Sequence, residues 1–180
     1  MERSKQEIRW VLLAQAGDRE AFDQLLHLVQ RPLYRYIAGL VGAPPLAEDI
    51  LQEVFILIYR KLRWLREPDL FRPWAYHIAT REAFKHLKRE RRWSEASVDE
   101  SALADIPAPP RDAFTEEFLT DLPHLVSRVS PASRAVIVLH YLNEMPLAEV
   151  ADVLGVALGT VKSRLAYGLD CLRKQLTTET

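Results

Sequence analysis

The chain of 180 residues has few of the residues that mark secreted or membrane proteins. A single cysteine excludes an internal disulfide framework and is typical of a reducing compartment. No run of about 18 apolar residues occurs, which argues against a transmembrane helix. The apolar stretch near the N-terminus is interrupted by charges and does not fit a secretory signal. Hydrophobic residues make up 48% and charged residues 27%, so most of the chain is expected to fold, as one ordinary domain or two small ones.

Charge is unevenly distributed, although the whole chain carries a formal net charge of only −1. Residues 1–96 carry +4, residues 97–120 carry −5, and residues 121–180 are neutral. The middle segment contains Pro107, Pro109 and Pro110, and no helix or strand period continues through it. We therefore predict two domains, joined by an acidic, proline-containing linker over residues 97–120.

Both predicted domains have apolar residues at helical spacing. Glycine, proline and charged breaks divide the first domain into helices near residues 8–16, 22–40, 46–62 and 72–93. The second domain is divided in the same way near residues 114–128, 131–142, 146–154 and 158–176. No alternation of polar and apolar residues extends far enough to predict a sheet, so the expected fold class is all-α.

The stretch PLAEVADVLGVALGTVKSRL, residues 146–165, has the pattern of a helix-turn-helix. Small Ala151 allows the second helix to approach closely, and Gly155 stands where the turn needs a left-handed backbone. Polar residues of the second helix then have access to phosphates and base edges in a major groove: Thr160, Lys162, Ser163 and Arg164. The alternative interpretation is an ordinary helical hairpin in which glycine only ends a helix.

Residues 71–93, FRPWAYHIATREAFKHLKRERRW, interleave cations with aromatic side chains. Cations follow phosphates and aromatic faces stack on unpaired bases, so this helix predicts binding of single-stranded nucleic acid. The candidate residues are Phe71, Arg72, Trp74, Tyr76, Arg81, Lys85, Lys88, Arg89 and Arg92. The alternative is an amphipathic helix with core aromatics and cations that are merely solvated.

An acidic and polar patch precedes that helix, with Asp49, Gln52 and Glu53 on one helical face. Like charges four residues apart oppose helix formation by about 0.2–0.5 kcal/mol, which favours a positively charged partner. The enzymatic alternative is a metal or an acid–base pair. The five histidines and Cys171 form no ligand spacing, and no glycine-rich phosphate loop occurs, so we predict no metal, no cofactor and no catalysis.

Three motifs follow one another in the chain: D-x-x-Q-E-V-F from Asp49, F-R-x-W-x-Y-x-I-A from Phe71, and G-T-V-K-S-R-L from Gly159. In this order they resemble bacterial RNA polymerase sigma factors of the sigma-70 family, extracytoplasmic-function (ECF) subfamily. The resemblance covers about Gly17 to Leu176. It implies sigma domain 2 in residues 1–96 and sigma domain 4, a winged-helix-like helix-turn-helix, in residues 121–180.

The resemblance also implies a function: an initiation factor that binds core RNA polymerase, directs it to promoters and aids DNA melting. Docking on the clamp helices of the β′ subunit falls on Asp49, Gln52, Glu53 and Phe55. Capture of the minus-10 strand falls on the loop 65–71 and on the cations and aromatics of residues 71–92. Reading of the minus-35 duplex falls on the four polar residues of the helix-turn-helix, whose domain also meets the β flap. The acidic linker is expected to thread toward the RNA exit path.

Two departures from the family pattern concern the last helix. Tyr167 and Leu169 stand where the family often has arginine, and Ala157-Leu158 stand where it often has Pro-Glu. Fewer phosphate contacts predict a weaker grip on minus-35 DNA and a shallower salt dependence. We hypothesise that Leu158, Tyr167 and Leu169 instead contact a partner protein such as an anti-sigma factor.

Two functions from other classes remain as alternatives. One is a stand-alone helix-turn-helix regulator that binds duplex operator DNA, and the other is a protein-binding adaptor of two helical bundles. A stand-alone regulator has no need of a basic, aromatic helix after an acidic docking helix, which favours the sigma factor. We expect a cytoplasmic protein with no membrane insertion and no small-molecule substrate.

Overall fold

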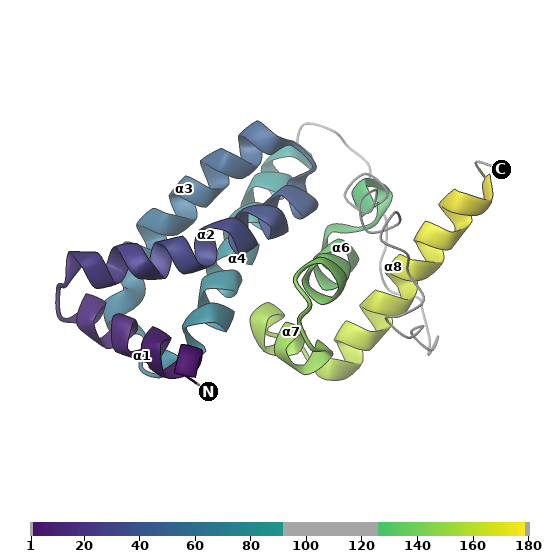
Figure 1. The fold of residues 1–180 in the computed structure, drawn as a ribbon. Coiled ribbons are helices and arrows are strands. Elements are labelled where there is room, and N and C mark those ends of the chain that lie inside the picture. Colours follow the sequence, from purple (N-terminus) through teal and green to yellow (C-terminus); the bar gives the residue numbers. More distant parts are fainter. Residues whose placement is uncertain (1, 92–125, 179–180) are drawn as a thin grey trace.

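The computed structural model describes residues 2–91 and 126–178 (Figure 1). The predicted linker, most of the predicted helix 114–128, and Arg92 lie outside these residues. The described part contains helices and no strand, which confirms the all-α class. The first domain consists of α1 (Glu2–Gln15), α2 (Arg19–Val41), α3 (Pro44–Lys61), the 3-10 turns η1 (Leu62–Trp64) and η2 (Pro68–Leu70), and α4 (Phe71–Arg91).

Local sequence explains where the long helices of the first domain begin and end. The Asp18 carboxylate accepts a hydrogen bond from the Ala21 backbone N–H at 3.0 Å and caps α2, a contact whose loss typically costs about 1 kcal/mol. Gly42 ends α2 in the left-handed conformation, with φ at 70°. Proline at the first position of α3 loses no helical hydrogen bond there. The predicted breaks at residues 17–18 and 42–45 are therefore confirmed.

A buried tyrosine pair joins α2 to α4 in the centre of the first domain. Tyr36 is fully buried, and its hydroxyl lies 2.7 Å from the Thr80 hydroxyl. The rings of Tyr36 and Tyr76 meet edge to face, with centroids 5.4 Å apart. Burial raises the pKa of Tyr36 far above its usual range, so the hydroxyl stays protonated.

The second domain consists of η4 (Val126–Arg128), α6 (Pro131–Ile137), η5 (Val138–Leu142), α7 (Leu147–Leu154) and α8 (Leu158–Thr178). The predicted helix 131–142 is continuous but changes to π-helical hydrogen bonding at Val138. Gly155 has a φ of 65° between α7 and α8, as the helix-turn-helix pattern requires. No strand accompanies these helices within residues 126–178, so the likeness to winged-helix proteins is limited to the helices.

The two domains pack directly on each other. α2 and α4 of the first domain contact η4, α6, η5 and α7 of the second. Figure 1 shows the green helices of the second domain beside the ends of α2 and α4. The buried apolar side chains of both domains form one hydrophobic cluster. The sequence predicted two helical units, but it did not predict that they contact each other.

Candidate functional site

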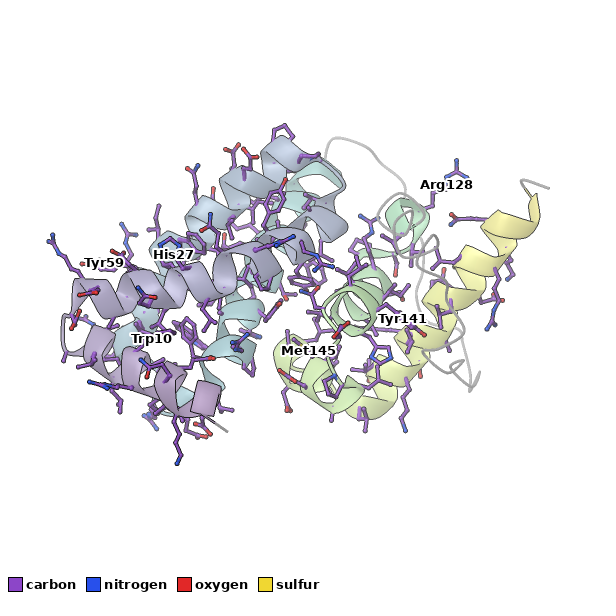
Figure 2. All side chains as sticks on the ribbon, viewed as in Figure 1. Trp10, His27, Tyr59, Arg128, Tyr141 and Met145 are labelled. Atoms are coloured by element: carbon purple, nitrogen blue, oxygen red, sulfur yellow. The ribbon has the colours of Figure 1, made fainter. Side chains whose placement is uncertain are left out.

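A groove of about 520 Å³ lies between α2 and α3. Gln52 and Phe55, two of the residues predicted to dock on polymerase, line it together with Glu48. The facing wall comes from α2 and includes His27, Arg31 and Tyr34. Figure 2 shows His27 on the part of α2 that lies away from the second domain. Asp49 is exposed on the same helix but does not line this groove.

Glu53, the fourth predicted docking residue, has a contact of its own across the first domain. His86 Nε2 of α4 donates a hydrogen bond to the Glu53 carboxylate at 3.2 Å. This hydrogen bond, with the nearby cations of α4, lowers the pKa of Glu53 below its ordinary value. Glu53 therefore joins α3 to α4, and it does not line the groove that Gln52 and Phe55 share.

The C-terminal half of α4 presents a row of cations to solvent. Arg81, Lys85, Lys88 and Arg89 are all exposed. Lys85 bonds to the Glu82 carboxylate at 2.9 Å, and this bond raises the pKa of the lysine. The row is accessible to phosphates, and whether it contacts them remains a prediction.

The aromatic residues predicted to stack on bases lie mostly in the core. Phe71 is fully buried, Tyr76 is buried, and Trp74 packs on the cluster from a half-buried position. The Tyr76 hydroxyl also accepts a hydrogen bond from Asn143 Nδ2 of the second domain at 2.8 Å. The prediction that the rings of Phe71 and Tyr76 stack on DNA bases is therefore wrong, because both rings are buried. Their apolar area stabilises the first domain instead.

An exposed aromatic residue that sequence reasoning missed lies just before the predicted strand-capturing loop. Trp64 has 66% of its surface exposed, and the guanidinium carbon of Arg63 lies 4.2 Å from its ring centroid. The signal in the sequence was a tryptophan between two arginines, Arg63 and Arg66, in a segment without apolar period. An exposed ring with a cation beside it is the arrangement that unpaired bases stack on.

Helix α1 fixes the position of this loop. Gln15 Nε2 donates hydrogen bonds to the carbonyls of Leu62 and Leu65, at 2.9 and 2.8 Å. Nε of Arg72 donates to the Glu7 carboxylate at 2.8 Å, which ties the start of α4 to α1 as well. Arg72, predicted as a DNA contact, thus has an ion pair within the first domain.

The N-terminal half of α8 presents the predicted duplex-reading side chains. Thr160, Lys162 and Ser163 are exposed, and Arg164 is half-buried. Val161 and Leu165 are buried on the opposite side of the helix and fix its orientation. The Ser163 hydroxyl donates to the Gly159 carbonyl at 3.0 Å, so its bond is to its own helix here.

The hypothesis of a partner surface on α8 is partly wrong. Leu169 is a core residue with 2% of its surface exposed, so it cannot contact a partner protein. Tyr167 is half-buried, and only Leu158 is well exposed.

The part of the chain that the structure describes contains no candidate metal site and no candidate membrane span. No group of three or more histidine, cysteine or acidic side chains there is arranged to hold a metal ion. No helix within those ranges has the length and apolarity needed to cross a membrane. Cys171 is a free, half-buried thiol on α8.

The fold and these surfaces define a two-domain helix-turn-helix protein of the kind that binds nucleic acid. Comparison with protein families matches residues 22–93 to Sigma-70 region 2 and residues 125–174 to Sigma-70, region 4. The ECF RNA polymerase sigma factor SigW of Bacillus subtilis (strain 168) is 28% identical over 89% of this chain and 91% of its own length. The ECF RNA polymerase sigma-E factor of Escherichia coli (strain K12) is 30% identical, with 84% of each chain covered.

The chain belongs to the sigma-70 family of RNA polymerase sigma factors, in the ECF subfamily. It is a transcription initiation factor that binds core RNA polymerase and directs it to specific promoters. Among solved structures, CnrH in complex with the cytosolic domain of CnrY has a TM-score of 0.72 and 20% sequence identity, covering 97% of this chain and 99% of that chain. The stand-alone regulator is not favoured, because the first domain matches region 2.

Proposed function

We propose that three surfaces of this chain divide the work of promoter recognition. The α2–α3 groove docks on the polymerase. The loop 65–71, with Trp64 before it and the cation row of α4, holds the melted minus-10 strand, and the start of α8 reads the minus-35 duplex. The observation that carries the proposal is the groove, since a free-standing DNA reader has no need of a preformed protein-docking surface beside its nucleic-acid contacts.

The chemistry of the groove supports a helical protein partner. Phe55 supplies a half-buried aromatic anchor at its wall, and Gln52 and Glu48 supply polar groups at its rim. Interfaces of this kind take most of their affinity from one or two such anchors, while the polar rim sets the register. The β′ clamp helices are the proposed occupant. Glu53 contributes through the position of α3, since its own carboxylate bonds to His86.

The loop and α4 bind a melted strand through two different interactions, which are base stacking and electrostatic attraction to phosphates. Unpairing a promoter costs on the order of 1.4 kcal/mol per stacked step. Stacking of a base on an aromatic ring stabilises the complex by about 1–3 kcal/mol. One base stacked on exposed Trp64 therefore offsets the free-energy cost of unpairing one or two base-pair steps. The exposed cations Arg81, Lys85, Lys88 and Arg89 add attraction to phosphates that does not depend on sequence.

We further propose that the chain is not an enzyme, that it acts in the cytoplasm where polymerase transcribes, and that an anti-sigma factor binds it. The last point is supported by a solved structure of similar fold, the sigma factor RpoE of Bartonella quintana, which is in complex with the anti-sigma factor NepR. Domain bounds of 1–96 and 121–180 are part of the same proposal, and the segment between them serves as the linker.

The docking assignment is tested by comparing Phe55→Ala with Ile56→Ala in core-polymerase binding and run-off transcription. Ile56 is the next residue of α3, is 51% exposed and does not line the groove, so it is a matched control for the loss of apolar surface. We expect Phe55→Ala to weaken core binding by about tenfold or more, and Ile56→Ala to change it less than about twofold. Circular dichroism verifies that both variants fold. Equal binding by the two variants would remove the groove from the proposal.

A further inference from the structure

Helix α1 has no part in the three surfaces proposed above. The match to Sigma-70 region 2 begins at residue 22, so α1 (Glu2–Gln15) precedes the matched range. Yet α1 contacts both short turns, η1 and η2, between which the minus-10 loop begins. A helix that contacts a DNA-binding loop at two separate points can fix the conformation of that loop.

The last turn of α1 is held in one conformation by the residues that follow it. Gly17 has a φ of 98°, and its N–H donates to the Ala14 carbonyl at 3.0 Å. The Asp18 N–H donates to the Leu13 carbonyl, also at 3.0 Å. These two bonds form a Schellman motif, which ends a helix at a left-handed glycine. Gln15, the last residue of α1, therefore extends from a fixed backbone.

The Gln15 amide holds the turn η1 at both of its ends. Its Nε2 donates to the carbonyls of Leu62 and Leu65, at 2.9 and 2.8 Å. The Leu65 N–H also donates to the Leu62 carbonyl at 3.0 Å, which closes the turn. Leu62 lies in the core, and Leu65 packs against it from a half-buried position. Both ends of the turn are thus fixed by apolar packing and by one shared side-chain donor.

Arg63 and Trp64 lie between these two anchors, and both are exposed. The Arg63 guanidinium lies over the Trp64 ring, so the two side chains form one surface. A ring that is 66% exposed takes its position mainly from the backbone that carries it. If that backbone has to become ordered when a base arrives, the cost of ordering it weakens binding. A fixed turn therefore offers a preformed surface for stacking.

Helix α1 also holds the far end of the loop. Arg72, the residue after the loop 65–71, donates to the Glu7 carboxylate at 2.8 Å. Glu7 is buried, with 8% of its surface exposed. Glu7 and Gln15 are eight residues apart on α1, a separation of about 12 Å at 1.5 Å per residue. The helix therefore lies along the loop, with a polar contact near each end.

We infer that Gln15 is a positioning residue for capture of the melted strand: its amide holds η1 in the conformation that presents Trp64 and Arg63 to unpaired bases. The inference rests on the proposed assignment of Trp64 and the loop 65–71 to the minus-10 strand. Gln15 acts through the position of the ring, so its effect is confined to the melted strand. Core-polymerase docking does not depend on it, since Gln15 does not line the α2–α3 groove.

The test compares Gln15→Met with Gln24→Met in core-polymerase binding and run-off transcription. Methionine keeps an unbranched side chain and a good helix propensity but has no N–H donor. Gln24 is exposed on α2 and does not line the α2–α3 groove, so it is a matched control for the loss of an amide. Transcription is measured from a duplex promoter and from the same promoter with its minus-10 segment already unpaired.

We expect Gln15→Met to give about tenfold less product from the duplex promoter, the effect of losing two ordinary hydrogen bonds. On the unpaired promoter the loss should be less than about threefold, because strand capture no longer has to offset the cost of melting. Core binding should stay within about twofold of wild type, and Gln24→Met should stay within about twofold in every assay. A merely structural defect would lower product from both promoters equally, and that result would overturn the inference.

A double-mutant cycle with Trp64→Ala tests whether Gln15 acts through the ring. Trp64→Ala alone is expected to lower product from the duplex promoter by about tenfold, and adding Gln15→Met should lower it by less than about threefold more. An equal loss from Gln15→Met with and without the ring would overturn the inference. Trp64→Ala protein that transcribes like wild type would instead contradict the proposed function. If Gln15→Met does not fold, as judged by circular dichroism, Gln15→Asn carries the same test, because its shorter amide does not reach both carbonyls.

Discussion

At the scale of single residues, Glu53 links the stability of the first domain to pH. Its carboxylate accepts a hydrogen bond from His86, which lowers its pKa from the ordinary value of 4.5. A carboxyl with a lowered pKa in the folded state contributes stability above its ordinary pKa, and the contribution is lost as the pH falls through the lowered value. The Glu53 side chain is 46% exposed, so solvent screening keeps the contribution below about 1 kcal/mol.

We therefore expect Glu53→Gln to be less stable than wild type at pH 7, and this difference to disappear as the pH falls below 4.5. Urea unfolding at a series of pH values measures it. Glu48→Gln, which removes an exposed carboxylate from the same helix, is the control for the loss of a negative charge. A stability difference for Glu53→Gln that stays constant at acid pH would contradict the role of this hydrogen bond.

At the residue scale, the sequence predicted correctly that the cations of α4 are exposed, but it predicted wrongly that the aromatic rings of Phe71 and Tyr76 are exposed. The cations of α4 are exposed as expected, because a desolvated guanidinium or ammonium costs too much free energy to bury without partners. Phe71 and Tyr76 are buried because aromatic rings stabilise a core as readily as a nucleic-acid surface. Composition alone does not distinguish these two uses of an aromatic residue, whereas Trp64 is identified by its exposure.

At the scale of secondary-structure elements, helix α8 carries the predicted minus-35 contacts at its start and an unrelated ion pair near its end. Lys162 and Arg164 lie in the N-terminal half, while Lys174 bonds to Asp170 at 2.7 Å. A cation that contacts a phosphate releases counterions from the DNA. Removing that cation therefore reduces the slope of log affinity against log salt concentration by about 0.9 per contact.

We expect Lys162→Ala and Arg164→Ala each to weaken holoenzyme binding to a duplex promoter, and each to reduce the slope of log affinity against log salt by about one. Lys174→Ala removes the same charge from the same helix and should leave the slope unchanged. Binding is measured by filter retention or fluorescence anisotropy at several salt concentrations. A slope reduced equally by all three variants would indicate a general effect of charge and not a contact by the start of α8.

The breaks between helices were the most predictable property at this scale, because capping and breaking residues act locally. The start of the first helix was predicted wrongly: α1 begins at Glu2 and not near residue 8. Asp18, Gly42 and Gly155 each end or begin a helix as their side chains or backbone freedom require. The change to π-helical bonding at Val138 was not predictable, since nothing in the apolar period marks it. That irregularity helps to form the end of η5, whose Leu142 carbonyl accepts the bond from Arg35.

At the scale of the whole molecule, the sequence predicted two domains but not their contact. The acceptors at the boundary are backbone carbonyls of helix ends, which every residue type possesses, so no motif marks them. Arg134 belongs to none of the sequence motifs, and it is buried and bonded to the Leu40 carbonyl of the first domain. Gly39 is a trace of the interface in the sequence, because it is a glycine inside a helix with no turn to explain it.

A continuous core predicts that the two domains unfold together, and the positions of the tryptophans make this testable. All four tryptophans, at positions 10, 64, 74 and 93, precede residue 97, so fluorescence reports on the first domain while circular dichroism reports on both. We expect the two urea transitions of the wild-type protein to coincide. Gly39→Gln places a helix-compatible side chain against Val138 and should open the boundary.

In the Gly39→Gln protein the two probes should separate, because the second domain loses the hydrogen bonds and apolar surface that α2 provides while the first domain keeps its own core. The dichroism curve then begins to fall at lower urea than the fluorescence curve. Ala38→Gln is the control, since it adds a side chain of the same kind one residue earlier on α2, at a half-buried position. Separate transitions already in the wild-type protein would mean that the two halves of the cluster are energetically independent. Coincident transitions in both Gln variants would mean that Gly39 is not where the domains are held together.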